Sequence, residues 1–260
     1  MRYFWLGILV GTMMLVACGD DDSDFAQEIV DPSTVVKDIM TDSRDGKTYK
    51  TVQIGDQIWM AENLNYETEN SYCYNDSIEL CEKFGRLYTW ADAMDSIGIW
   101  TQNGYDCGNK KNCKPIYPVR GVCPRGWHLP TKAEFEILFS AVDGLSTDGA
   151  VLKSTSGWED YRGKIGNGTD VYSFAVLPAG YGGLLGFNQK GYGAYFWSST
   201  ETEIGDFDNA YLDALTDVGI DANTEIASCA YGVDFQTEFS EAGLDIFGKS
   251  MWYSVRCVKD

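Results

Sequence analysis

The chain has 260 residues and a formal net charge of −19 at pH 7. Nucleic-acid binding depends on clustered Lys and Arg, so this charge excludes nucleic acid as a partner. The 28 glycines and the 14 % of aromatic residues favour a fold of short strands, turns and loops.

The first residues have the pattern of a bacterial lipoprotein signal. Arg2 supplies a basic start, an apolar run follows, and residues 15–18 (LVAC) end in a cysteine. The run is shorter than the about 20 apolar residues that cross a bilayer, so a spanning helix is excluded. We expect residues 1–17 to be a signal peptide and Cys18 to carry acyl chains such as palmitate. The membrane would then be a partner through this lipid anchor.

Residues 18–44 form an acidic, weakly patterned segment that we interpret as a tether. Its cluster DDDSD at residues 20–24 resembles the signal that sends some lipoproteins of Bacteroidota-like bacteria to the outer face of the outer membrane. A solvated acidic tether is the simpler interpretation, and the two are compatible. The predicted location is therefore the outer membrane, at the cell surface.

Two elements open the globular part. Residues 47–61 (KTYKTVQIGDQIWMA) alternate apolar and polar side chains around the Gly55–Asp56 pair, which predicts a β-hairpin. Residues 85–94 (GRLYTWADAM) predict a short amphipathic helix. Its apolar stripe consists of Leu87, Trp90, Ala91 and Met94.

A second helix follows Pro130, where Thr131 and Glu134 form a capping-box pattern. Its apolar stripe is Phe135, Leu138, Phe139 and Val142. Strands are expected later in the chain, and early helices followed by strands indicate an α+β domain. The expected strands are residues 172–177, 194–199, 210–215, 230–235 and 252–258.

The sequence has eight cysteines, of which seven follow Cys18. In an exported chain these seven are expected to form disulfides, and their spacing around a lone His128 does not fit a zinc site. Seven cysteines allow about 105 arrangements of three bridges. Proximity favours two small loops and one long loop and leaves Cys229 unpaired, the pairs being Cys73–Cys81, Cys107–Cys113 and Cys123–Cys257.

Six segments follow one another at a distinctive spacing: DGKTYKTVQIGDQIWMAENLNY (45–66), GRLYTWADAM (85–94), GVCPRGWHLPTKAEFEILF (121–139), LPAGY (177–181), FWSSTE (196–201) and YSVRCVKD (253–260). Together they resemble the Fibrobacter succinogenes major paralogous domain (FISUMP) family over nearly all of residues 45–260. The family is typical of lipoproteins and secreted proteins and implies no particular activity. The resemblance also implies a single domain with a C-type lectin-like fold, similar to that of the sulfatase-modifying, formylglycine-generating proteins.

In a lectin-like domain the first and last strands pair, and a disulfide such as Cys123–Cys257 closes the domain. The resemblance also makes residues 158–194 the long loop region, where that fold class places its ligand site. The aromatic residues of this region that we single out as ligand contacts are Trp158, Tyr161, Tyr181 and Tyr192. The alternative is that these rings fill the interior of the loops. For the framework tryptophans we expect core positions, at Trp59, Trp90, Trp127, Trp197 and Trp252.

The sequence gives little support for a metal site or a catalytic site. The lectin-like calcium strings Glu-Pro-Asn and Trp-Asn-Asp do not occur. A solvated acidic loop is favoured over a calcium site for the group Asp217, Asp221, Asn223 and Glu225. We expect no cofactor and no metal.

The sequence gives equally little support for catalysis by a cysteine. The formylglycine-generating proteins use two closely spaced cysteines near the C-terminus, whereas Cys229 and Cys257 are far apart. A buried thiol is therefore favoured over a reactive one for Cys229. His128 is expected to be a packed, hydrogen-bonded residue rather than a general base.

These observations predict a surface-anchored, non-catalytic binding module whose ligand is a polysaccharide or another envelope protein. Two alternatives stay open. One is an enzyme of unknown class that uses acidic residues or Cys229, and the other is a purely structural envelope protein.

Overall fold

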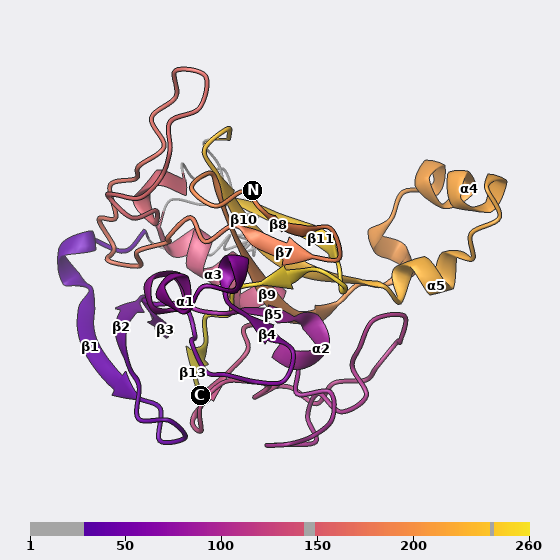
Figure 1. The fold of residues 1–260 in the computed structure, drawn as a ribbon, viewed down its shortest axis with the longest axis horizontal. Helices are drawn as coiled ribbons and strands as arrows, with labels where there is room; N and C mark the ends of the chain where they lie inside the picture. The colour runs from indigo at the N-terminus through magenta and orange to yellow at the C-terminus, as the bar shows by residue number, and fades with distance from the viewer. Residues whose placement is uncertain (1–28, 143–148, 240–241) are drawn as a thin grey trace, which may run out of the picture.

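A computed structural model describes residues 29–142, 149–239 and 242–260 (Figure 1). The predicted signal, the lipidation site Cys18 and the aspartate cluster at 20–24 lie outside these residues. Three antiparallel sheets and five short α-helices make up the described chain, which confirms the predicted α+β class. Within the same residues, no helix combines the length and apolar character that a bilayer crossing requires.

The predicted hairpin at 47–61 forms, and it extends into a five-stranded sheet. This sheet has the order β1-β2-β3-β13-β6. The pairing of β13 with β3 and β6 places the end of the chain beside the first hairpin. The strands are β1 (Val36–Thr41), β2 (Thr48–Ile54), β3 (Gln57–Met60), β6 (Trp127–His128) and β13 (Val258–Lys259).

β1 corrects the predicted tether, which was expected to run to residue 44. Its six residues pair with β2 from Val36 opposite Gln53 to Thr41 opposite Thr48. None of its side chains is buried, so the strand is held mainly through its backbone. Its sequence, VKDIMT, also lacks an alternation of apolar and polar residues. Strand periodicity therefore gave no signal for it.

Two further sheets carry the later strands. A three-stranded sheet contains the predicted strands 194–199 and 230–235, in the order β11-β10-β9. Its members are β9 (Gly193–Glu201), β10 (Cys229–Gln236) and β11 (Gly243–Gly248). The other sheet has the order β4-β5-β12-β7-β8, with β4 (Ser71–Tyr72), β5 (Leu87–Thr89), β7 (Tyr181–Gly183), β8 (Gly186–Asn188) and β12 (Trp252–Tyr253). The predicted strand 252–258 is thus split between β12 and β13.

The helices are short and capped by side chains. In the predicted capping box, the backbone N–H of Thr131 donates to Oε2 of Glu134 (2.7 Å) and the N–H of Glu134 donates to Oγ1 of Thr131 (3.2 Å). The helix predicted at 85–94 is shorter than expected, because Leu87 lies on β5. The helices are α1 (Ile78–Phe84), α2 (Trp90–Ala93), α3 (Lys132–Val142), α4 (Asn209–Asp217) and α5 (Ala222–Ile226), with 3-10 turns η1 (Pro32–Thr34), η2 (Tyr74–Asp76), η3 (Gly149–Val151) and η4 (Ile204–Asp206).

Two predicted strands were wrong. Residues 210–215 belong to α4, whose first turn is capped by Asp208 accepting from the N–H of Tyr211 (2.7 Å). Residues 172–177 are irregular apart from one bridge at Val176. The fully buried Arg256 replaces a strand partner there, because Nη1 donates to the carbonyl of Phe174 and Nη2 to that of Ala175 (2.8 Å).

The core consists of two aromatic clusters on either side of the five-stranded sheet that contains β13. Four of the five framework tryptophans are buried as predicted, namely Trp59, Trp90, Trp127 and Trp197. Trp252 is half-buried and stacks on Tyr72 at 3.8 Å between ring centroids. All three predicted disulfides form, and Cys229 is free and buried: the bridges are Cys73–Cys81, Cys107–Cys113 and Cys123–Cys257.

Candidate ligand-binding pocket

A pocket of about 530 Å³ opens where four segments distant in the sequence meet. These are η2, the loop around Tyr161, the β8–β9 connection and the end of β10. In Figure 1 the long loop that follows η3 rises on the side of the molecule where β10 ends. The pocket is lined by Tyr74, Asn75, Tyr161, Phe187, Asn188, Gln189, Lys190, Tyr192, Gln236, Thr237 and Glu238.

The first wall is η2, which the Cys73–Cys81 disulfide ties to α1. Asn75 in this turn has φ 51°, a left-handed conformation that Asn adopts more readily than most residues. The ring of Tyr74 packs against Phe187 of β8, with 5.0 Å between centroids. A covalent link and an aromatic contact therefore hold this wall in place.

The second wall is the tight turn between β8 and β9. Gln189 has φ 62°, and its carbonyl accepts from the N–H groups of Tyr192 (2.9 Å) and Gly193 (2.8 Å). Gly191 has φ 88°, and a Cβ there would lie 2.8 Å from Cγ of Glu159. The glycine is needed because the turn closes directly on the Glu159 side chain.

The third wall brings Tyr161 against Tyr192, edge to face, with 6.4 Å between centroids. Two backbone hydrogen bonds with Lys164 fix the turn at Tyr161 (3.1 and 2.9 Å). The ammonium of Lys164 donates to the carbonyl of Glu238, which joins this loop to the end of β10. Tyr161 is half-buried and Tyr192 is 39 % exposed, so both rings retain accessible surface.

The floor comes from the end of β10. The N–H of Thr237 donates to the carbonyl of Tyr192 (2.9 Å). Its hydroxyl is buried and has no hydrogen-bond partner among the described residues. Gln236 donates its side-chain amide to the carboxylate of Asp234. Burial raises the pKa of Asp234 despite this hydrogen bond, and the charge of Asp245 adds to the effect.

Two of the four aromatic residues predicted as ligand contacts meet in this pocket, Tyr161 and Tyr192. Trp158 does not: it is 5 % exposed, and its Nε1 donates to Oγ of Ser154 (3.2 Å) and the carbonyl of Val176 (3.0 Å). The ring of Trp158 therefore fills the interior of the loops, which is the alternative that the sequence left open. Burial removes its apolar surface from water, and its only hydrogen-bond donor has partners there.

Tyr181 lies on β7 and packs edge-on against core rings. The centroid distances are 5.1 Å to Tyr195 and 6.2 Å to Tyr253. Sequence reasoning missed Tyr74 and Phe187, which replace Trp158 and Tyr181 as the aromatic walls. The available signal for Tyr74 was its place directly after Cys73, inside a loop predicted to be closed by a disulfide.

Cys229 lies at the start of β10 and is buried. Burial raises the pKa of its thiol, and the charge of Glu225 raises it further against the opposing effect of Lys249. A thiol with a raised pKa is a poor nucleophile at neutral pH. This environment disfavours the alternative in which Cys229 performs catalysis.

His128 is buried between two carboxylates, with Nε2 2.7 Å from Oε1 of Glu134 and Nδ1 2.9 Å from Oδ1 of Asp260. It is the packed, hydrogen-bonded residue that the sequence predicted. Through these two contacts His128 links the beginning of α3 to the C-terminal end of the chain. This arrangement indicates a structural role for His128.

The acidic group weighed as a calcium site lies on α4 and α5. The carboxylate of Asp221 caps α5 by accepting from the N–H of Thr224 (3.1 Å), and Asp217 is the last residue of α4. Across the described ranges, no three or more His, Cys, Asp or Glu residues are grouped so as to hold a metal ion.

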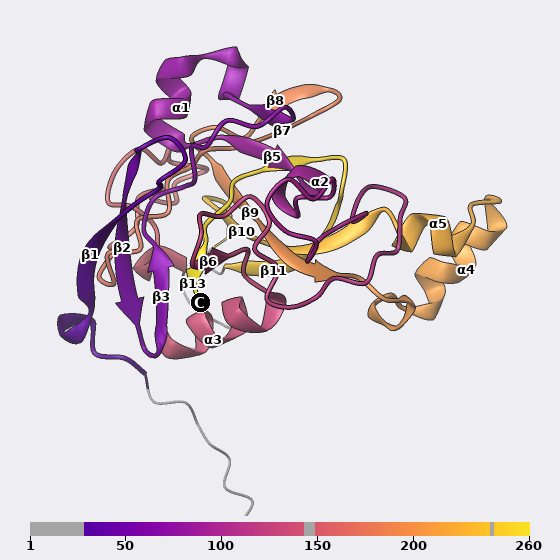
Figure 2. The same cartoon turned by 90° about the horizontal axis from the view of Figure 1, so that it is seen from below.

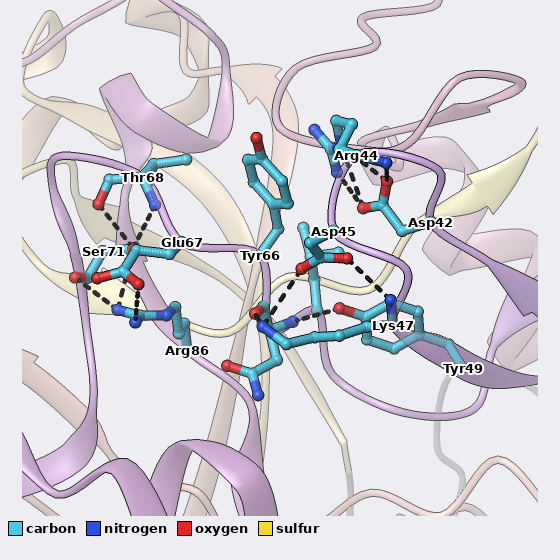
Figure 3. Close-up of polar contacts among 12 residues, drawn as sticks. Asp42, Arg44, Asp45, Lys47, Tyr49, Tyr66, Glu67, Thr68, Ser71 and Arg86 are labelled. Atoms are coloured by element: carbon cyan, nitrogen blue, oxygen red, sulfur yellow. Dashed lines mark hydrogen bonds and ion pairs between the residues drawn. The ribbon is translucent and has the colours of Figure 1, made fainter.

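A second polar cluster, around Arg44, is drawn in Figure 3. Arg44 pairs with Asp42 (Nη2 to Oδ2, 2.6 Å), and its guanidinium lies 3.8 Å from the ring centroid of Tyr66. Arg86 pairs with Glu67 (3.0 Å) on the same segment. These contacts fasten residues 65–71 to the folded body, so we assign the cluster to structure rather than to ligand binding.

A family model described as the Fibrobacter succinogenes major domain matches residues 52–259. The chain belongs to this family. The match runs from within β2 to the end of β13, so the Fibrobacter succinogenes major domain includes the pocket, the three disulfides and most of both aromatic clusters. The chain matches no curated protein and no solved structure.

Proposed function

We propose that this chain is a surface lipoprotein whose domain binds polysaccharide, without catalysis, in the pocket lined by Tyr74, Tyr161 and Tyr192. The observation that carries the proposal is the combination of these three rings with side-chain amides around one cavity of about 530 Å³. Cavities of roughly 300–1,000 Å³ with aromatic walls and a few polar groups are typical of small-ligand sites.

The chemistry of the lining suits a sugar. The flat, weakly polar faces of pyranose rings pack on aromatic side chains, and the rings of Tyr161 and Tyr192 line the pocket and keep accessible surface. Amides both donate and accept, which suits hydroxyl groups, and Asn188 and Gln189 supply them.

The proposed location rests on the lipoprotein pattern that ends in Cys18 and on the acidic cluster after it. Three disulfides support an oxidising compartment. Labelling with a fatty-acid analogue tests the anchor: the wild type is expected to be labelled and Cys18→Ala to be unlabelled. Equal labelling of both proteins would contradict it.

A C-type lectin-like fold is part of the same proposal. Two features support it. The C-terminal strand β13 pairs between β3 and β6, and the Cys123–Cys257 disulfide ties the approach to α3 to the chain end. The pocket is also built largely from the loop region of residues 158–194, where that fold class places its ligands.

The experiment is binding of the purified mature protein to a panel of soluble and insoluble glycans. We expect retention on at least one glycan and a loss of about five- to tenfold in Tyr161→Ala and Tyr192→Ala, since stacking on one ring contributes about 1–1.5 kcal/mol. The matched control is Tyr211→Ala, because Tyr211 is 40 % exposed, as Tyr192 is, and lies on α4.

No retention on any glycan would leave the purely structural alternative. Equal loss in Tyr192→Ala and Tyr211→Ala would place the contact elsewhere on the surface. Hydrolysis of a retained glycan would reveal an enzyme instead of a binding module.

A further inference from the structure

Between β9 and β10 the chain leaves the body as a helical arm, residues 203–225, that contains η4, α4 and all of α5 except its last residue, the buried Ile226. Figures 1 and 2 both show the arm standing clear of the three sheets. Every residue of the arm is described, and Leu215 is the only one of them that is buried. The arm thus adds almost nothing to the core of the domain, although it connects two strands, β9 and β10, that pair with each other in the three-stranded sheet.

The root of the arm is held firmly. Oγ1 of the buried Thr202 donates to the carbonyls of Ile226 and Cys229, both at 3.1 Å. On the other side, the ammonium of the buried Lys249 donates to the carbonyl of Ala227 (2.9 Å). These contacts fix the direction in which the arm projects from the body, so the arm is not a loosely tethered loop.

The arm itself lacks the packing that short helices need. α4 has nine residues and α5 has five, whereas isolated helices shorter than about 12–15 residues are marginal in water. Large apolar side chains nevertheless face solvent: Ile204 is 57 % exposed, Val218 71 % and Ile220 43 %. A partner that covered these side chains would supply the missing core.

The charge of the arm defines that partner. Residues 203–225 contain seven acidic and no basic residues, and the chain has no Lys or Arg between Lys190 and Lys249. A second copy of the chain would bring a net charge of −19 against the same arm, and an anionic membrane or a nucleic acid would also be repelled. A basic surface is the complement.

We propose that the arm docks into an apolar groove, rimmed by Lys and Arg, on another protein. The exposed apolar side chains favour a protein over a cationic polymer, because burying Val218 and Ile220 requires an apolar counterpart. Asp213 and Asp217 lie on α4, whose C-cap is Val218, and their carboxylates pair with the basic rim. This interface is separate from the proposed glycan pocket, so either proposal can fail without the other.

Photo-crosslinking in the cells that produce the protein tests the docking. p-Benzoylphenylalanine is placed at Val218 and, as the control, at Ile97, which is 68 % exposed and lies outside the arm. The crosslinked peptides are then sequenced by mass spectrometry. The expected adduct at Val218 is a segment of another protein in which apolar residues are flanked by Lys or Arg, and the Ile97 position gives no such adduct.

Asp213→Asn with Asp217→Asn is the second variant, introduced beside the photoreactive residue. We expect the adduct to fall about tenfold, because both carboxylates face the basic rim. A loss of folding would not explain this fall, since a carboxylate at a helix C-terminus is unfavourable and Asp217→Asn stabilises α4. An adduct with a second copy, a lipid or a glycan, no specific adduct, or a protein adduct indifferent to these substitutions would overturn the proposal.

Discussion

Nε2 of His128 lies 2.7 Å from Oε1 of Glu134, the carboxylate that also closes the capping box of α3. Burial by itself lowers the pKa of His128, but the hydrogen bonds and charges of Glu134 and Asp260 together raise it above its ordinary value. For Glu134, burial acts to raise the pKa, and the contacts with His128 and Thr131 outweigh it, so the pKa is lowered. The pair therefore favours its ionised form.

The stability that this pair provides should depend on pH in a defined direction. The contribution of His128 is complete below its unfolded pKa of about 6.5 and is lost as pH rises through its higher folded pKa. That of Glu134 is present above its unfolded pKa of about 4.3 and is lost as pH falls through its lower folded pKa. We therefore expect the largest contribution between about pH 4.5 and 6.5.

Urea unfolding of the wild type and His128→Gln at pH 5.5, 7.0 and 8.5 measures this dependence. The difference in free energy of unfolding is expected to be largest at pH 5.5, about 1–3 kcal/mol, and to shrink by pH 8.5. The chain contains a single histidine, so the difference isolates one imidazole. A difference that stays constant from pH 5.5 to 8.5 would show that the ring acts only through its shape.

The Cys73–Cys81 disulfide should matter for ligand binding as well as for stability. It closes an eight-residue separation and fixes the η2 wall that carries Tyr74 and Asn75. In the chain-entropy model a loop of this size contributes about 2.5 kcal/mol. We expect Cys73→Ala with Cys81→Ala to lose this amount in urea unfolding and to weaken glycan retention about tenfold, because the wall loses its preorganisation.

The Cys107–Cys113 bridge is the matched control, since it closes a six-residue separation outside the pocket. Its double alanine variant is expected to lose a similar free energy, about 2 kcal/mol, and to keep full glycan retention. If both double variants lose binding equally, the effect comes from global destabilisation, and the wall has no special role.

The elements predicted correctly are those with local signals. The hairpin at 48–60 shows alternation and a Gly55–Asp56 turn, and α3 shows a capping box with an apolar stripe. The two short disulfides followed from proximity. Each of these signals is contained within about a dozen residues, so no knowledge of the tertiary structure was needed.

The elements predicted wrongly depend on distant residues. β1 has no apolar pattern because it is held by the backbone of β2. Residues 172–177 have the composition of a strand, but the guanidinium of Arg256 takes the place of a strand partner for Phe174 and Ala175. The pocket could not be predicted for the same reason, because only the folded sheets bring Tyr74 and Phe187 close to Tyr192.

Arg256 should be irreplaceable by another cation. It is 1 % exposed, burial lowers its pKa to about 9, and Nε donates to Oδ1 of Asn63 (2.9 Å) in addition to the two carbonyls of the 172–177 segment. Lysine has a single ammonium and cannot reproduce this planar fork. We expect Arg256→Lys to lower the free energy of unfolding by about 2–4 kcal/mol, since buried acceptors lose their donors.

Arg86→Lys is the control for this prediction. The guanidinium of Arg86 pairs with the carboxylate of Glu67, whose side chain is 76 % exposed. The side chain of Arg86 is itself only 12 % exposed, but lysine keeps the charge and solvent screens the pair at Glu67, so a loss below about 1 kcal/mol is expected in the same urea experiment. Equal losses in Arg256→Lys and Arg86→Lys would mean that the fork geometry of Arg256 does not hold the irregular segment.

The ammonium of Lys249 is the most buried cation at the root of the arm. It donates to the carboxylate of Glu201 and to the carbonyls of Lys111 (3.0 Å) and Ala227 (2.9 Å). It also lies 4.4 Å from the ring centroid of Trp90. Burial lowers the pKa of Lys249, and the hydrogen bond and charge of Glu201 oppose this effect. Removing the cation alone would leave a carboxylate with little solvent around it.

We therefore expect Lys249→Met to lower the free energy of unfolding by about 3–5 kcal/mol, because the side chain of Glu201 is 12 % exposed and would be left unpaired. Adding Glu201→Gln should recover part of this loss, since the amide is neutral and its oxygen still accepts from the N–H of Cys113 (3.0 Å in the wild type). Urea unfolding of both variants measures the recovery. If the double variant is no more stable than Lys249→Met, the loss comes from the three hydrogen bonds of the ammonium rather than from an unpaired charge.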